Sequence, residues 1–200
     1  MKKNNMEFNS YFVKIFKESI ETKKKALSLS SLSASLKEAC EVMIESIRNK
    51  NKIIFAGNGG SAADAQHLAA ELVNRFEFDR NPLPSISLTT DTSVITSISN
   101  DYGYKYIFSK QLESIGSKGD VFVGITTSGN SENIIEALKI AHKYGIKSIV
   151  LCGSNVEKIP RETSHIISVP SNKTARIQET HILLGHIICG HIENYFFNNS

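Results

Sequence analysis

A glycine-rich stretch from Gly57 to Ser61, with the sequence GNGGS, stands directly before a helical pattern. Glycines let backbone amides approach an anion closely, and the first turn of a helix offers unpaired N–H groups and the positive end of its dipole. The stretch therefore predicts an anion-binding loop. The local alternative is a tight turn in which Ser61 caps the helix and Asp64 completes a capping box.

A second loop, TTSGNS from Thr126 to Ser131, also leads into a helical pattern. The hydroxyls of Thr126, Thr127, Ser128 and Ser131 can surround a phosphate with neutral donors, so no Lys or Arg is required. An ordinary helix cap explains one hydroxyl but not four. Both loops follow predicted strands, and open α/β sheets bind ligands at the carboxyl ends of their strands. We therefore expect a phosphate site at this edge.

His67 and Glu71 lie four residues apart in the helical pattern that follows the glycine-rich stretch. That spacing puts both side chains on one face of the helix. An imidazole and a carboxylate placed in this way can share a divalent metal or act as an acid–base pair. An exposed, hydrogen-bonded pair explains the same spacing.

The last helical stretch, RIQETHILLGHIICGHIENYFF, is apolar nearly all round, which is typical of a buried helix. It nevertheless contains Gln178, His181, His186 and His191, and buried polar groups need partners. The three histidines are spaced by five and point ~140° apart in turn, so they cannot form one joint site. Gln178 and His186 return to within ~80° and can face one cavity. Spacing alone makes none of them a ligand.

Asn100 and Asp101 belong to a predicted turn from Ser99 to Gly103. Their side chains can hydrogen-bond the hydroxyls of a sugar. Asx residues in a glycine-containing turn have an equally good local explanation.

The elements that must position these residues alternate along the chain. Short β-branched runs predict strands, and stretches with apolar residues at helical spacing predict helices between them. The strands are expected at 52–56, 85–88, 120–125, 147–151 and 165–169, and the helices at 62–76, 104–115, 131–144 and 175–196, after two N-terminal helices within 8–48 that are separated at 28–33. The order predicts an α/β fold, a three-layer αβα sandwich with about five parallel strands, as a single domain over 1–200.

Composition excludes several classes of protein. Lys and Arg number 23 against 20 Asp and Glu, and a net charge of +3 predicts neither nucleic-acid nor membrane binding. Cys40, Cys152 and Cys189 are odd in number and include no C-x-x-C pair, which argues against disulfides and thiolate metal sites. No secretory signal and no long apolar run is present, so we expect a cytoplasmic location.

Together these motifs resemble the phosphoheptose isomerase family. The resemblance rests on the Gly57–Ser61 stretch with Asp64, His67 and Glu71, on the Asn100–Gly103 segment, on the Thr126–Ser131 loop, and on Arg176–Glu179 with His186. It covers nearly the whole chain and implies a sugar-isomerase (SIS) fold of flavodoxin-like type.

The resemblance also implies roles for individual residues. Zinc, one ion per subunit, would be held by His67, Glu71, Gln178 and His186. Phosphate would be bound by Ser61, Thr126, Thr127, Ser128 and Ser131, and the sugar by Asn58, Gly59, Gly60, Glu71, Asn100, Asp101 and Gln178. Residues 8–50 would assemble a homotetramer with sites between subunits, and residues 52–197 would form the phosphosugar-binding core.

The implied reaction converts D-sedoheptulose 7-phosphate to D-glycero-D-manno-heptose 7-phosphate, the first step of nucleotide-activated heptose biosynthesis, through an enediol. We expect Glu71 to act as the base and His186 as the acid. Three alternatives stay open: a noncatalytic SIS adaptor that binds a replication initiator, a sugar-phosphate sensor, and an isomerase for another phosphosugar. Glu71 and His186 together favour catalysis, since neither an adaptor nor a sensor needs an acid–base pair.

Overall fold

The computed structural model describes residues 2–198, with side chains from residue 7, and centres on one parallel sheet. Its strands are β1 (Ile53–Gly57), β2 (Ser85–Ser87), β3 (Val121–Thr126), β4 (Lys147–Cys152) and β5 (His165–Ser168), in the order β2-β1-β3-β4-β5. All pairs are parallel, and Gly57 lies opposite Ile125. Central strands are buried on both faces, as parallel sheets require, and the five predicted strands are confirmed.

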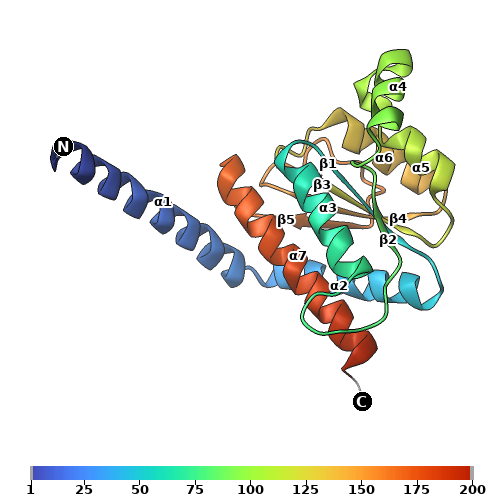
Figure 1. Cartoon of the computed structure of the whole chain (residues 1–200), viewed down its shortest axis with the longest axis horizontal. Coiled ribbons are helices and arrows are strands. Elements are labelled where there is room, and N and C mark those ends of the chain that lie inside the picture. Colours follow the sequence, from blue (N-terminus) through green and yellow to red (C-terminus); the bar gives the residue numbers. More distant parts are fainter. Residues whose placement is uncertain (1, 199–200) are drawn as a thin grey trace.

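Helices cover both faces of the sheet (Figure 1). They are α1 (Lys2–Ser28), α2 (Ser30–Arg48), α3 (Gly60–Val73), α4 (Thr92–Tyr102), α5 (Ser109–Ile115), α6 (Glu132–Lys143) and α7 (Thr174–Phe197), with a 3₁₀ turn, η1, at Tyr104–Tyr106. Alternate residues of β1 enter opposite cores. Ile53 and Phe55 pack with α2, α3 and α7, whereas Ile54 and Ala56 pack with α5 and α6. The predicted three-layer sandwich is confirmed.

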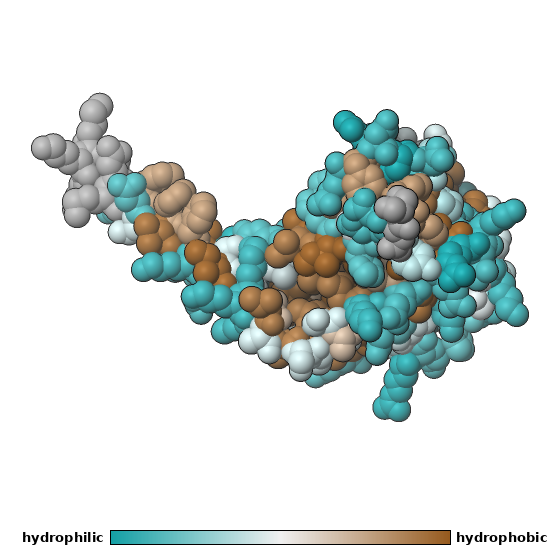
Figure 2. All heavy atoms as spheres, turned by 90° about the horizontal axis from the view of Figure 1, so that it is seen from below, coloured by the Kyte–Doolittle hydropathy of each residue, from teal (hydrophilic) through white to brown (hydrophobic). Residues whose placement is uncertain are grey.

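The N-terminal helices break at a single residue, Leu29, and not over the six residues expected. α1 then extends from the body as a long arm (Figure 1). Seen from below, hydrophobic side chains gather along α1 and in the hollow where it joins the body (Figure 2). Within residues 2–198, no helix is long and apolar enough to cross a membrane.

The segment before η1 is a helix, α4, which the sequence pattern did not predict. Asp91 accepts a hydrogen bond from Val94 N at 3.0 Å and caps the helix, and Ile95 and Ile98 pack toward the sheet. Hydroxyl and β-branched residues of low helix propensity hide this pattern in the sequence. Asn100 and Asp101 therefore lie in the last turn of a helix, and the predicted turn at that position was wrong.

Candidate active site

Three side chains that could hold a metal meet between α3 and α7. His67 and Glu71 come from α3, and the 2.8 Å hydrogen bond between His67 Nε2 and Glu71 Oε1 confirms that they share a face. His186 comes from α7, and its ring lies edge-on to His67 with centroids 5.1 Å apart. One ligand atom from each residue lies within 4.8 Å of the others. We call these three residues the imidazole–carboxylate cluster.

Close contact between two helices brings His186 to this place. A Cβ on Gly185 would lie 2.5 Å from Cδ2 of Leu68, so the glycine lets α7 approach α3 this closely without displacing the Leu68 side chain. His186 follows Gly185 in the chain, and His67 precedes Leu68. The contact therefore sets the two imidazoles side by side.

Phe76, just beyond α3, stacks on the other side of His186. The ring centroids are 5.3 Å apart with an interplanar angle of 27°. His186 is thus held between His67 and Phe76, and its ring plane is fixed by packing. Glu71 is mostly buried, with 20% of its side chain exposed, whereas His67 is 46% exposed, so the cluster is open to solvent at one edge.

Asp64 also faces this cluster, one turn before His67, and its local interpretation as part of a capping box was wrong. The helix begins at Gly60 with Gly59 as its cap, and no side chain caps it. Oδ2 of Asp64 is buried without a hydrogen-bond partner among the described residues. Burial raises the pKa of this carboxyl, and the nearby His67 and His186 oppose that rise. The spacing Asp64, His67, Glu71 on one helical face was the sequence signal for it.

Gln178, which belongs to α7, packs against Gly60 at the beginning of α3, beside the glycine-rich loop. A Cβ on Gly60 would be 2.5 Å from Nε2 of Gln178. Since α7 rises ~1.5 Å per residue, Gln178 lies roughly 12 Å along the helix from His186. Both residues face α3, as their spacing allows, but the role of Gln178 as a fourth metal ligand stays a prediction.

The two hydroxyl- and glycine-rich loops stand side by side at the carboxyl edge of β1 and β3. Thr126 Oγ1 and Ser131 Oγ are 2.8 Å apart, and Ser131 makes no capping hydrogen bond to α6. Its hydroxyl is therefore not explained by a helix cap. Ser61 is buried in the first turn of α3, while Thr127 is half-buried and Ser128 is exposed.

Asn58 and Asn133 tie these loops together, and Asn133 was not identified from the sequence. Asn58 Nδ2 donates to Asn133 Oδ1 at 2.9 Å, and Asn133 Nδ2 donates to Asn58 Oδ1 at 2.8 Å. The hydroxyl of Tyr104 also donates to Asn58 Oδ1, at 3.0 Å. The reciprocal amide pair fixes the orientation of Asn58 at the mouth of the loop.

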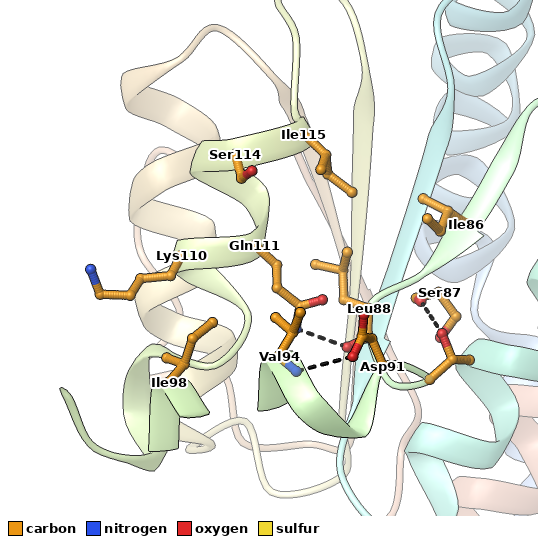
Figure 3. A pocket seen from close by; sticks show the side chains of 11 residues that line it. Ile86, Ser87, Leu88, Asp91, Val94, Ile98, Lys110, Gln111, Ser114 and Ile115 are labelled. Atoms are coloured by element: carbon orange, nitrogen blue, oxygen red, sulfur yellow. Dashed lines mark hydrogen bonds between the residues drawn. The ribbon is translucent and has the colours of Figure 1, made fainter. Parts of the chain in front are cut away.

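Asn100 and Asp101 lie exposed at the end of α4, where Asn100 Nδ2 donates to Asp101 Oδ1 at 2.8 Å. Figure 3 shows how α4 is attached to the sheet edge: Asp91 caps it, and nearby Gln111 donates to the carbonyl of Leu88 at 3.0 Å. The cavity drawn there, of about 370 Å³, contains none of the predicted site residues.

The remaining histidines of α7 stay outside the cluster. His181 is buried, and its Nε2 lies 3.1 Å from the carbonyl oxygen of Cys152. His191 is exposed. Neither histidine is among the metal ligands that the family resemblance implies.

A parallel αβα sheet with glycine and hydroxyl loops at its carboxyl edge defines a domain of the sugar-isomerase class. The family model for the SIS domain matches residues 9–153. The chain is 49% identical over 191 residues, 96% of each chain, to the phosphoheptose isomerase of Aneurinibacillus thermoaerophilus. It is 49% identical to phosphoheptose isomerase 2 of Campylobacter jejuni, with 94% of each chain covered.

Solved structures give the same result. Phosphoheptose isomerase GmhA from Neisseria gonorrhoeae matches with a TM-score of 0.86 and 43% identity, over 94% of this chain and 99% of that one. The chain belongs to the SIS domain family and, within it, to the phosphoheptose isomerases.

Proposed function

We propose that this protein is an aldose–ketose isomerase that converts D-sedoheptulose 7-phosphate to D-glycero-D-manno-heptose 7-phosphate. The observation that carries the proposal is the convergence of His67, Glu71 and His186 beside two phosphate-type loops, in a chain of this family. Similarity to proteins named phosphoheptose isomerase favours catalysis over the adaptor and sensor alternatives.

The loops would hold the far end of an extended sugar. Ser61, Thr126, Thr127, Ser128 and Ser131 would donate to the phosphate, and backbone amides at the start of α3 would add to this site. Asn58, Gly59, Gly60, Asn100, Asp101 and Gln178 would contact the sugar. Binding at the phosphate then positions the reacting carbons, which lie at the other end of the substrate.

The cluster would perform the proton transfers. The isomerisation needs a base that moves a proton between C1 and C2 and an acid that transfers protons to and from the oxygens on these carbons. We assign Glu71 as the base and His186 as the acid. Phe76 and His67 hold the imidazole of His186 on two sides, so its nitrogens face a fixed direction.

The cluster also fits a divalent metal, for which we propose zinc. Two imidazole nitrogens and one carboxylate within 4.8 Å of one another are a donor set typical of a catalytic zinc site. The buried Oδ2 of Asp64 beside them has no hydrogen-bond partner among the described residues, and a nearby cation would favour the charged form of this carboxyl. His67, Glu71 and His186 would hold the ion, with Gln178 as the proposed fourth ligand. When bound, it would polarise the sugar oxygens as a Lewis acid.

The test is the conversion of sedoheptulose 7-phosphate, followed by NMR with and without a chelator. We expect Glu71→Gln and His186→Gln, made separately, each to lower turnover by ~10²-fold or more, because each removes a proton-transfer group. His191→Gln is the matched control, since it changes an exposed histidine of the same helix and should leave turnover unchanged. Near-normal turnover in either cluster variant would contradict the assignment.

For assembly, we propose a homotetramer built on α1, with sites at subunit interfaces. Phe8, Phe12, Phe16 and Ile20 recur at helical spacing and are all exposed, Phe8 by 64%. An apolar stripe on a projecting helix favours burial against other copies of the chain. For the location, we propose the cytoplasm, and the three free, buried cysteines are compatible with a reducing compartment.

A further inference from the structure

Glu193 is a fully buried carboxylate on α7, two turns beyond His186. Its Oε1 accepts hydrogen bonds from Phe76 N at 2.9 Å and from Arg80 Nε at 2.8 Å, and its Oε2 accepts one from Glu77 N at 2.7 Å. Burial alone would raise the pKa of Glu193, but these donors lower it, so the group is a carboxylate. A buried charge with this many partners is held in one geometry.

Arg80 extends the same contact to the end of α3. Its side chain is only 1% exposed, and its guanidinium donates to the backbone oxygens of Glu71 at 2.7 Å and Leu72 at 2.8 Å. The last carbonyls of a helix have no intrahelical partner, and a cation there also complements the helix dipole. Arg80 therefore caps α3 at the turn that carries Glu71.

These contacts reach both members of the proposed acid–base pair. Glu193 fixes the backbone of Phe76, whose ring stacks on His186, and Arg80 fixes the backbone of Glu71. A Cβ on Gly190 would meet Phe76 Cε1 at 3.3 Å, so α7 also leaves room for that ring. No atom of the ion pair needs to touch the substrate for it to set the relative position of Glu71 and His186.

We propose that Glu193 and Arg80 form a positioning pair that locks the end of α3 to α7 and so fixes His186 against Glu71. Its effect on turnover rests on the proposed function, whereas its effect on the His186 ring does not. The test is chosen accordingly: ring resonances of His186 by NMR in the full-length protein, together with kcat and KM for sedoheptulose 7-phosphate.

Asp120 supplies a matched control. It is buried, and it accepts hydrogen bonds from Lys52 N at 3.0 Å, Lys52 Nζ at 2.6 Å and Ser117 N at 2.8 Å, next to the amino end of β3. Glu193 likewise accepts from two backbone amides and one cationic side chain. Glu193→Gln and Asp120→Asn each remove one such buried charge, so both should lower the melting temperature, but only Glu193 is next to the cluster.

We expect Glu193→Gln to shift the His186 resonances and to lower kcat ~10-fold with KM little changed, which is the range of loss seen when a group that orients a site residue is removed. Asp120→Asn should lower the melting temperature to a comparable extent, but it should leave both the His186 resonances and kcat unchanged. Phe76→Leu, which keeps the ion pair, should reproduce the His186 shift. If Glu193→Gln does not fold, Arg80→Lys takes its place.

Unchanged His186 resonances in the folded pair variant, or equal shifts in Asp120→Asn, would overturn the proposal. A wild-type protein without isomerase activity would instead refute the proposed function. The His186 comparison would still stand in that case, so the two failures are distinguishable.

Discussion

His181 and His186 stand five residues apart on α7, yet their surroundings differ. The carbonyl of Cys152 can only accept a hydrogen bond, so Nε2 of His181 must carry the proton. Its Nδ1 is buried without a partner among the described residues, and burial lowers the pKa of His181 to about 4. His181 is thus a neutral packing group. His186 is half-buried between the rings of His67 and Phe76, which suits the proton transfer proposed for it.

The buried His181 should make stability depend on pH. Its pKa is about 4 in the folded protein and ~6.5 when unfolded, so below pH ~6.5 the unfolded chain binds the proton first. The free energy of unfolding should therefore fall as pH drops from ~6.5 toward 4, by ~2 kcal/mol at pH 5 from this residue. Denaturant unfolding at pH 7 and pH 5 measures it.

The comparison is between wild type, His181→Gln and His191→Gln. Between pH 7 and pH 5, His181→Gln should lose ~2 kcal/mol less free energy of unfolding than the wild type does, whatever its stability at pH 7. His191 is exposed, so its replacement should leave the pH dependence as in wild type. Identical pH dependence in all three proteins would contradict the assignment of a neutral, buried His181.

At the residue scale, sequence spacing could predict contacts within one helix and not those between helices. His67 and Glu71 are four apart, so their shared face was predictable, and the 2.8 Å bond confirms it. The approach of His186 depends on Gly185 meeting Leu68, a packing detail that spacing does not contain. For Asp64 the sequence left a capping box open as the local alternative, because a hydrogen bond within the first turn of a helix would also explain a carboxylate at that position.

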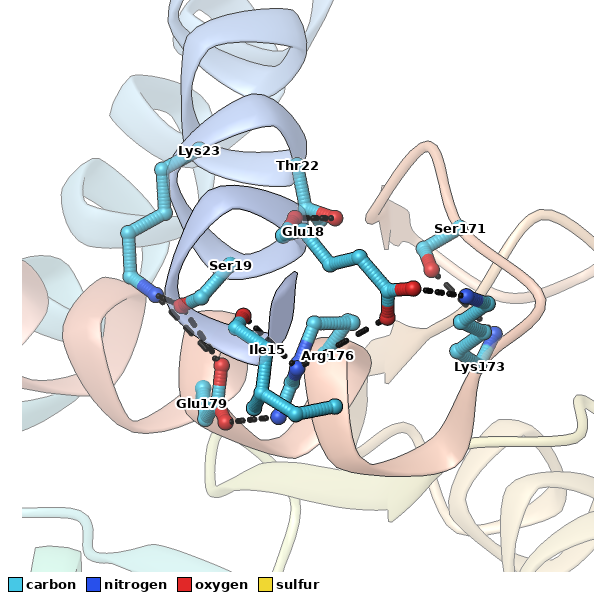
Figure 4. Close-up of polar contacts among 9 residues, drawn as sticks. All are labelled: Ile15, Glu18, Ser19, Thr22, Lys23, Ser171, Lys173, Arg176 and Glu179. Atoms are coloured by element: carbon cyan, nitrogen blue, oxygen red, sulfur yellow. Dashed lines mark hydrogen bonds and ion pairs between the residues drawn. The ribbon is translucent and has the colours of Figure 1, made fainter. Parts of the chain in front are cut away.

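At the scale of elements, a polar network attaches α1 to the start of α7 (Figure 4). Arg176, which is buried, donates to the carbonyl of Ile15 at 3.1 Å and pairs with Glu179. Glu179 in turn accepts a hydrogen bond from Ser19 at 2.7 Å. Gln178 lies between Arg176 and Glu179 in sequence, so the network holds the same turn of α7 that reaches the glycine-rich loop.

Removing Glu179 should therefore loosen α1 before the rest of the protein. Glu179→Ala leaves the buried Arg176 with fewer partners, at a cost of ~1–3 kcal/mol for the local contact. We expect faster hydrogen exchange in the second half of α1, with little change in α3, when peptides are followed by mass spectrometry. Lys37→Ala, which removes an exposed ion pair with Glu41 on α2, is the control. Unchanged exchange in α1 would contradict this role.

Elements were predictable where burial leaves a pattern in the sequence. The central strands β1, β3 and β4 are buried along nearly their whole length and appear as apolar runs. The edge strands β2 and β5 are only partly buried but were also predicted. α4 was missed because its hydroxyl residues are typical of loops, and only its cap at Asp91 and its packing through Ile95 and Ile98 make it a helix. The predicted helix over 104–115 is divided into η1 and α5, since Ile107 and Phe108 turn into the core between them.

At the scale of the whole molecule, α1 leaves large apolar side chains exposed to solvent. The rings of Phe12 and Phe16 are tilted against each other with centroids 4.5 Å apart, yet both remain about half exposed. Where α1 meets α2 and α7, Leu27, Leu183 and Ile187 are exposed around an apolar groove of about 300 Å³. A single chain leaves this surface in water, whereas assembly would bury it and release the free energy of burying apolar area.

Phe12→Ser combined with Phe16→Ser tests this explanation. The wild type should sediment at four times the chain mass of 22.1 kDa, and the double variant as a smaller species. Its far-ultraviolet circular dichroism should stay close to wild type, because the sheet and its covering helices do not include these rings. Val156→Ser, at an exposed apolar residue far along the chain, should leave the assembly intact.

The assembly experiment also shows whether one chain is sufficient for the active site or whether neighbouring subunits share it. If subunits share it, isomerase activity should fall together with the sedimentation coefficient, and high protein concentration should restore both by mass action. If activity persists in the dissociated species, His67, Glu71 and His186 of one chain are sufficient, and α1 serves assembly alone. A wild type that sediments as a single chain would contradict the tetramer, and the apolar stripe of α1 would then need another partner.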